Sequence, residues 1–210
     1  MPADATDPPA TVVPPAGGEP GGAALPDLAA TVAGYRPASA AEAADLARIR
    51  ALPAGDPWSR RRALHVTGSA LVVHPPSGRV LLRWHERMGS WLQVGGHGDP
   101  GETSPAAVAR REAIEETGLP DLGFWPDPSL PRLVHVVCVP VPAGNGEPAH
   151  EHADLRYVLA TARPDALVPE SPAARLRWLT LDEAATEVGE DNLRVTLGRV
   201  AALLAASTSA

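Results

Sequence analysis

The feature that most constrains this chain is a helix whose two ends can both be recognised in the sequence. Ser104 is a natural N-cap residue, and Pro105 suits the first position of a helix. Gly118 fits the position just beyond a helix C-terminus, where glycine is the commonest residue. We therefore predict that the segment between Ser104 and Gly118 is helical.

Three carboxylates lie on one face of this predicted helix. Glu112, Glu115 and Glu116 have the spacing i, i+3 and i+4, so their side chains point the same way. Like charges so placed repel one another and weaken an isolated helix. A hard divalent cation, which takes oxygen ligands and bridges to phosphates, is the simplest compensation. A solvated acidic helix face is the alternative interpretation.

A glycine-rich turn, residues 95–101, precedes the predicted helix. Such a turn lets the backbone approach a ligand closely. A strand-like segment, residues 90–94, leads into the turn. A solvated acidic helix face does not explain why a strand and a glycine-rich turn precede the helix. The turn and the helix together therefore favour a ligand-binding or metal-binding site.

These residues resemble the Nudix box of the Nudix hydrolases, whose pattern is G-x5-E-x7-R-E-U-x-E-E-x-G-U with U aliphatic. The matching positions are Gly96, Glu102, Arg111, Glu112, Ala113, Glu115, Glu116, Gly118 and Leu119.

The chain departs from that pattern in one place, because eight residues rather than seven separate Glu102 from Arg111. Either Arg110 takes the place of the arginine, or the loop has gained one residue. Counted from the N-cap Ser104, Arg111 has the expected register, which puts the extra residue at Thr103 or Ser104. With this extra residue, the sequence does not decide whether the side chain of Glu102 can reach that of Arg111.

The resemblance implies a metal centre. Glu112, Glu115 and Glu116 would be the metal ligands, together with a backbone carbonyl of Gly95 or Gly96. The implied cofactor is Mg²⁺, with Mn²⁺ as an alternative.

The resemblance also implies catalytic and structural roles within the box. Glu115 and Glu116 are the nearer candidates for the general base, although a glutamate elsewhere could take this role. Glu170, which precedes the last strand-like segment, is such a glutamate. Arg111 is expected to pair with Glu102 and so to tie the loop to the helix.

Substrate contacts are expected from outside the helix. His97 directly follows the glycine pair, and Asp154 and Arg156 are candidates for lining the cleft. His150 and His152 share the period-two spacing of Asp154, so on a strand they would form a metal-binding or substrate-binding wall. The interpretation that we favour is a loop that enters a strand there.

The expected fold class is α+β, a Nudix-like α/β/α sandwich with a mixed β-sheet and an N-terminal helical extension. Residues 1–24 are rich in Pro, Gly and Ala and are expected to be disordered. Residues 25–62 are the expected helical extension, in which Ser39 and Glu42 make a capping box. Residues 63–206 are the expected Nudix hydrolase domain. Its predicted strands are 65–73, 79–83, 91–94, 132–141, 155–160 and 176–179, and its last helix opens at Asp191.

Composition restricts the partners. The net charge of −7 argues against a general nucleic-acid-binding protein, so no nucleic-acid polymer is expected. No run of about 18 apolar residues is present, so no membrane contact is expected. The single cysteine, Cys138, excludes an intramolecular disulfide and fits a reducing compartment. The expectation is a cytoplasmic enzyme with a small nucleotide-type diphosphate as substrate, and a homodimer is compatible with it.

Three functions remain open from the sequence. The resemblance favours a metal-dependent pyrophosphohydrolase that cleaves the diphosphate of a nucleotide or nucleoside diphosphate derivative. An isopentenyl diphosphate isomerase, which resembles Nudix proteins in fold, would need Cys138 as its reactive cysteine. A non-catalytic, nucleotide-binding regulatory module is the third alternative, although such proteins usually lose the box glutamates that this chain retains.

Overall fold

A computed structural model describes residues 24–144 and 146–208 of the chain. Eight strands form one mixed sheet. In chain order they are β1 (Leu64–His74), β2 (Arg79–His85), β3 (Ser90–Leu92), β4 (Val94–His97), β5 (Gly123–Phe124), β6 (Leu133–Val141), β7 (His150–Ala160) and β8 (Leu176–Leu179). The helices are α1 (Leu28–Gly34), α2 (Ala40–Arg50), α3 (Pro105–Thr117), α4 (Leu181–Glu187) and α5 (Asp191–Thr208), with short 3₁₀ turns η1 (Pro75–Ser77) and η2 (Pro164–Ala166).

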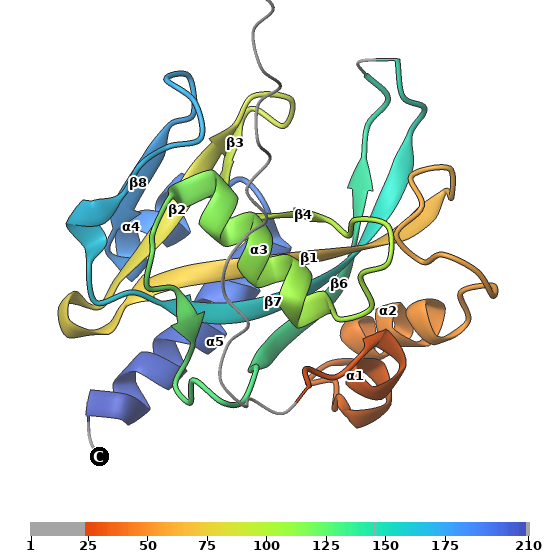
Figure 1. The fold of residues 1–210 in the computed structure, drawn as a ribbon, viewed down its shortest axis with the longest axis horizontal. Helices are drawn as coiled ribbons and strands as arrows, with labels where there is room; N and C mark the ends of the chain where they lie inside the picture. Colours follow the sequence, from red (N-terminus) through yellow and green to blue (C-terminus); the bar gives the residue numbers. More distant parts are fainter. Residues whose placement is uncertain (1–23, 145, 209–210) are drawn as a thin grey trace, which may run out of the picture.

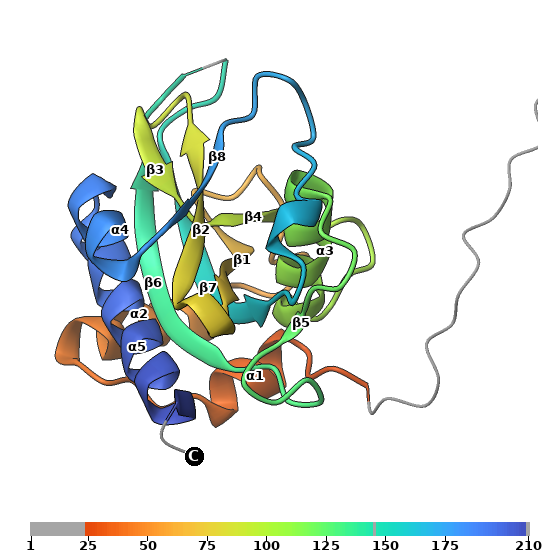
Figure 2. The ribbon, with the colours of Figure 1, turned by 90° about the vertical axis from the view of Figure 1, so that its left-hand side faces the viewer.

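The helices lie in layers on both sides of the sheet. Helix α3 crosses one face, and α4 and α5 cover the other, as the two views at right angles show (Figures 1 and 2). The expected α/β/α sandwich with a mixed sheet is therefore confirmed. No helix in the described parts of the chain has the length and apolar character needed to cross a membrane.

Strand β1 is the centre of the sheet. It pairs in parallel with β7 over nearly its whole length. Its other edge is shared between β4, which pairs with residues 67–70, and β2, which pairs with residues 72–74. Strands β5 and β6 pair with β7, while β3 and β8 pair with β2. Because two strands divide one edge, β4 presents its glycines beside β1 and under α3.

Both faces of β1 are buried along nearly its whole length. Val66 and Val72 belong to the core beneath α3, whereas Leu71 and Val73 belong to the core beneath α4 and α5. Each face of the strand packs against its own helical layer, so apolar residues are required at successive positions and not only at every second one.

Strand β7 begins at His150, five residues before the predicted start at Leu155, and the favoured loop interpretation of 150–154 is wrong. The register of the parallel pair begins at Leu64 opposite Glu151, so β1 orders this segment along its edge. The polar residues of this segment are typical of a loop, but in the structure His150, His152 and Asp154 line a pocket.

The N-terminal helical extension contains α1 and α2, while residues 51–62 form an irregular connector. Val32 and Leu46 belong to the same core cluster as the sheet beneath α3. The capping box of α2 is only half formed. Ser39 accepts from the Glu42 N–H, but the Glu42 carboxylate accepts from Ala38 rather than from Ser39. The predicted disordered segment 1–24 lies outside the described residues except for Ala24.

Candidate active site

Local signals position α3 as the sequence predicts. Ser104 caps its N-terminus, and Gly118 ends it in the left-handed conformation with φ 63°. The helix lies very close to the sheet at Gly68 of β1. A Cβ at this glycine would be 2.6 Å from the Pro105 carbonyl oxygen. Only a residue without a side chain allows this approach, which holds the helix against β1 and its neighbour β4.

The carboxylate of Glu112 lies directly against the backbone of β4. A Cβ at Gly96 would be 2.5 Å from the Glu112 Oε2 atom, so the missing side chain of Gly96 provides the space for this carboxylate. Burial raises the pKa of Glu112, although the guanidinium of Arg111 opposes the shift.

Arg111 links the loop before α3 to the helix. Its guanidinium donates to both oxygens of Glu102, at 3.1 and 2.9 Å, and to the His97 carbonyl oxygen at 2.8 Å. Its remaining terminal nitrogen lies 3.0 Å from carboxylate oxygens of Glu112 and Glu115. The arginine register counted from Ser104 is thus the one present, and the extra loop residue does not prevent the pair with Glu102.

Arg110 does not take this role, because its guanidinium Nε donates to the Leu122 carbonyl oxygen. Burial alone would raise the pKa of Glu102, but hydrogen bonds from Arg111 and from the Asp99 N–H outweigh it and lower that pKa.

Glu116 is held on the other side of the glutamate face. It accepts from the Gly95 N–H at 3.2 Å, and the Arg83 guanidinium lies 3.4 Å from its other oxygen. Arg83 also forms an ion pair with Glu170, which brings this loop glutamate to the edge of the box helix. Burial raises the pKa of Glu116 to about 7, despite the nearby Arg83 and the Gly95 N–H.

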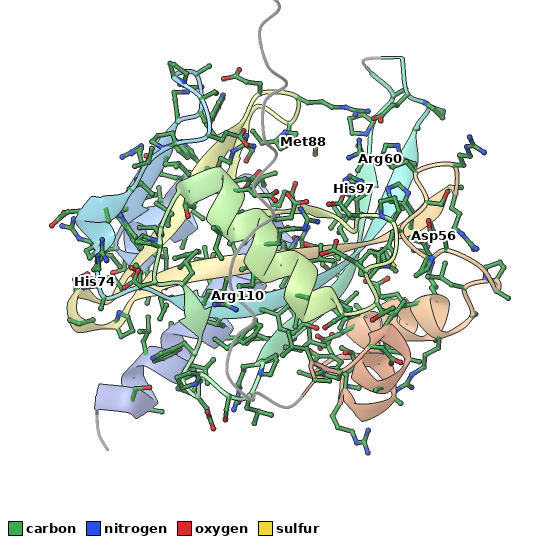
Figure 3. All side chains as sticks on the ribbon, viewed as in Figure 1. Asp56, Arg60, His74, Met88, His97 and Arg110 are labelled. Carbon is green, nitrogen blue, oxygen red and sulfur yellow. The ribbon has the colours of Figure 1, made fainter. Side chains whose placement is uncertain are left out.

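A pocket of about 490 Å³ opens beside these residues, and Glu112, Gly95 and Gly96 form part of its lining. His97 and Arg60 also line it. Figure 3 labels both on the same side of the molecule. Of the Arg60–Arg62 cluster, only Arg60 lines the pocket, whereas Arg62 donates to the carbonyls of Pro53 and Ala54.

Asp154 and Arg156 form a buried ion pair in the pocket wall, with Nε and Oδ2 2.8 Å apart. Asp154 also accepts hydrogen bonds from Thr67, Ser69 and Gln93. With its oxygens so fully engaged, Asp154 is suited to fixing the shape of the wall.

Four histidines meet in the same pocket: His65, His97, His150 and His152. The sequence pattern predicts the last three as candidates and leaves His65 out. One signal for His65 is present in the sequence. It is two residues before Thr67 and four before Ser69, so on a strand all three side chains point to the same face, which forms the polar wall of the pocket. Burial, with the neighbouring Arg60 and histidines, lowers the pKa of His97 to about 3. Burial and His65 likewise lower the pKa of His152 to about 4.

Cys138 lies outside the pocket lining, on β6, where its N–H donates to Asp45. Burial and the Asp45 carboxylate raise the pKa of its thiol to about 12. A protonated, half-buried thiol away from the pocket gives no support to the isomerase interpretation.

Comparisons with known proteins agree with this geometry. The NUDIX domain family matches residues 64–197. A Nudix-family hydrolase from Clostridium perfringens superimposes with a TM-score of 0.51 at 23% identity, over 66% of this chain and 97% of its own. A C. elegans Ap4A hydrolase superimposes with a TM-score of 0.53 at 18% identity, over 67% of this chain and 98% of its own. No curated protein sequence matches. With the matched domain spanning the whole sheet and the box helix, the chain belongs to the Nudix hydrolase family.

Proposed function

We propose that this protein hydrolyses a diphosphate linkage in a nucleotide or nucleoside diphosphate derivative and depends on a divalent cation. The observation that carries the proposal is the placement of three glutamates on α3. Glu112 lies against Gly96 and lines the pocket, Glu116 accepts from the Gly95 N–H, and Glu115 is joined to Glu112 through Arg111. The proposed ligands are these three carboxylates and a backbone carbonyl of Gly95 or Gly96.

The chemistry of these residues fits Mg²⁺ or Mn²⁺. Carboxylate and carbonyl oxygens are the ligands that hard divalent cations prefer. Gly96 leaves a space that a Cβ would fill, and the Glu112 carboxylate occupies its edge. Glu112 and Glu116 are both largely buried, so a cation would compensate charge that burial makes costly.

The bound cation would neutralise the diphosphate, activate a water molecule and stabilise the leaving oxygen. The side chains supply position and proton transfer. Arg111 holds Glu102, Glu112 and Glu115 in one network, which fixes the loop relative to the helix. Glu115 or Glu116 takes a proton as the general base, and the Arg83–Glu170 pair borders Glu116.

The surrounding pocket would hold the remainder of the substrate. Arg60 offers a cation for a phosphate oxygen, and His97 lies beside the glycine strand. The buried Asp154–Arg156 pair keeps its wall rigid. We propose a cytoplasmic location, and a homodimer stays a prediction.

The test is a panel of diphosphates assayed for released phosphate or pyrophosphate, with Mg²⁺, with Mn²⁺ and with EDTA. The panel contains nucleoside triphosphates, an oxidised one, ADP-ribose, coenzyme A and sugar nucleotides. Dinucleoside polyphosphates are included as well because a structural neighbour is named an Ap4A hydrolase. We expect turnover of at least one compound in the presence of metal, and none in EDTA.

Variants locate the activity. Glu115→Gln and Glu116→Gln should each abolish turnover while the circular dichroism spectrum stays native. Glu86→Gln, which alters an exposed glutamate outside the box, is the matched control and should leave turnover unchanged. Turnover that survives both box substitutions, or silence across the panel from folded protein, would contradict the proposed function.

A further inference from the structure

A second group of metal-ligating side chains lies in the pocket wall beside the box. Among the residues that the structure describes, His65, His150 and His152 have ligand atoms that all lie within 4.8 Å of one another. Their ring centroids are 4.9 to 5.1 Å apart. None of the three belongs to the box.

The sheet brings these histidines together in a defined register. His65 of β1 and His152 of β7 are direct partners in the parallel ladder. His150 precedes His152 by two residues, so both side chains leave β7 on the same face. The pairing of β7 with β1 and with β6 therefore holds the three imidazoles, which favours a site that exists before a ligand binds.

Backbone carbonyls fix the tautomer of two of these rings. His65 Nδ1 lies 3.1 Å from the Arg62 carbonyl oxygen, and His150 Nδ1 lies 2.9 Å from the Pro148 carbonyl oxygen. A carbonyl only accepts, so each Nδ1 must carry the proton. In the neutral rings the lone pair is then on Nε2, which is the arrangement that outer-shell hydrogen bonds give to metal-ligating histidines.

The Nε2 atoms of His150 and His152 lie close together. His150 Nε2 lies 3.3 Å from His152 Nε2, and one ligand atom of each of the three rings lies within 4.8 Å of the others. With its proton on Nδ1, His65 accepts at Nε2 a hydrogen bond from the His97 Nε2–H at 3.0 Å, and a bound metal ion would replace this hydrogen bond. Nitrogens bound at about 2.0–2.1 Å to a tetrahedral ion are about 3.4 Å apart, which matches the separation of His150 and His152, and the His65 ring would move towards this pair on binding. We propose that His65, His150 and His152 form a binding site for a divalent transition-metal ion such as Zn²⁺, separate from the carboxylates of α3.

The two sites differ in the ions that they prefer. Imidazole nitrogens suit Zn²⁺, Co²⁺, Ni²⁺ and Cu²⁺, whereas carboxylates and carbonyls suit Mg²⁺ and Mn²⁺. Three protein ligands leave one tetrahedral position for water or for an anionic group. Because Glu112 and the histidines line one pocket, that position faces the same space as the box.

Cobalt spectroscopy on the full chain tests the proposal without an activity assay. Chelator-treated protein is titrated with Co²⁺, and a four-coordinate nitrogen site gives intense visible bands, whereas an octahedral oxygen site gives weak ones. We expect intense bands that saturate at one Co²⁺ per chain and are displaced by Zn²⁺. His152→Ala and His150→Ala should each weaken Co²⁺ binding at least about 100-fold, since even an outer-shell partner contributes 10- to 100-fold.

Two controls separate this site from others. Glu116→Gln should leave the intense bands unchanged, because it alters only the box. His74→Ala should also leave them unchanged, because His74 lies at the far end of β1, where its ring contacts Ser77 (Figure 3). His150 and His152 are both only partly buried, so neither substitution removes a core side chain and each variant is an independent test. Wild-type protein without intense bands, or bands that persist in folded His150→Ala, would show that the histidines bind no such ion.

Discussion

Gly96 sets the distance between β4 and the Glu112 carboxylate. The contact that a Cβ would make here is with the far end of a flexible side chain, so the glutamate can move away at little cost to the fold. We predict that Gly96→Ala leaves the free energy of unfolding within about 1 kcal/mol of wild type. It should lower metal-dependent turnover about 100-fold, because a displacement of about 1 Å at a reacting centre has effects of this size.

Gly123→Ala is the matched control, since a Cβ at this glycine would meet nothing within 4 Å. Turnover and urea unfolding of both variants are measured side by side. An active Gly96→Ala protein would show that the position of Glu112 against β4 does not matter for catalysis.

At the level of residues, the sequence predicted contacts between residues that are close in the chain. It did not predict the contact between His65 and His152, which depends on the register of two strands. The N-cap Ser104 was enough to choose Arg111 over Arg110, because helix periodicity carries the choice along the chain. His65 could not be grouped with His152 in this way. The two are neighbours only through the parallel pairing of β1 with β7, and the sequence does not encode that register locally.

Among the elements, the loop before α3 depends on the N-terminal extension. The Trp58 indole N–H donates to the Glu102 carbonyl oxygen at 2.8 Å, and its ring fills the space beside Gly98. The Leu28 N–H donates to the carbonyl oxygen of Thr103, one of the two candidates for the extra residue. The lengthened loop thus provides a carbonyl to which α1 is attached.

Trp58 substitutions separate packing from hydrogen bonding. Trp58→Ala should reduce the free energy of unfolding by about 3–5 kcal/mol, because it removes a large buried ring. Trp58→Phe keeps an aromatic ring and loses the N–H, so we predict a loss of about 1 kcal/mol together with reduced turnover from a looser Glu102. Urea unfolding and the metal-dependent assay provide the two measurements.

Trp178→Phe is the control for the lost hydrogen bond. The Trp178 indole donates to the Pro164 carbonyl oxygen at 3.2 Å, away from the box, so a similar loss of stability should leave turnover unchanged. If the two Phe variants lower turnover equally, the loop support assigned to Trp58 is wrong.

Elements with strong local end signals were the predictable ones. Helix α3 has the ends that Ser104 and Gly118 predict, and α5 begins at Asp191 as expected. The start of β7 was missed because a strand that lines a polar pocket has the composition of a loop. The β-propensity of a residue reflects how well it fits its neighbours in a sheet, and these neighbours are set by tertiary contacts that the local sequence does not reveal.

Across the whole molecule, one buried ion pair joins the N-terminal extension to the last helix. Arg199 of α5 donates to both oxygens of Glu42 in α2, at 2.7 and 2.9 Å, and to the Val134 carbonyl oxygen of β6. The Tyr35 hydroxyl donates to the same carboxylate. The sequence predicted only a helix-capping role for Glu42, because a capping pattern can be recognised from neighbouring residues. Its ion-pair partner Arg199 is 157 positions away and cannot be recognised in this way.

Stability in acid should depend on this carboxylate. Burial alone would raise the pKa of Glu42, but hydrogen bonds from Arg199, Tyr35 and the backbone lower it from 4.5 to about 2. Its stabilisation is therefore complete above the unfolded value and is lost as the pH falls from about 5 towards 2. The shift corresponds to about 3 kcal/mol, and Glu42→Gln should lose at least that at pH 7 and leave Arg199 unpaired.

Urea unfolding of wild type and of Glu42→Gln between pH 7 and pH 2 measures this contribution. The difference between the two proteins should shrink as the pH falls below 5, because the unfolded wild-type chain then takes up a proton at Glu42 while the folded protein keeps the carboxylate ionised until about pH 2. Glu187→Gln breaks an exposed pair with Arg177 and should change stability by less than about 1 kcal/mol at any pH. A Glu42→Gln difference that stays constant down to pH 2 would mean that packing, rather than the charge of Glu42, joins α2 to α5.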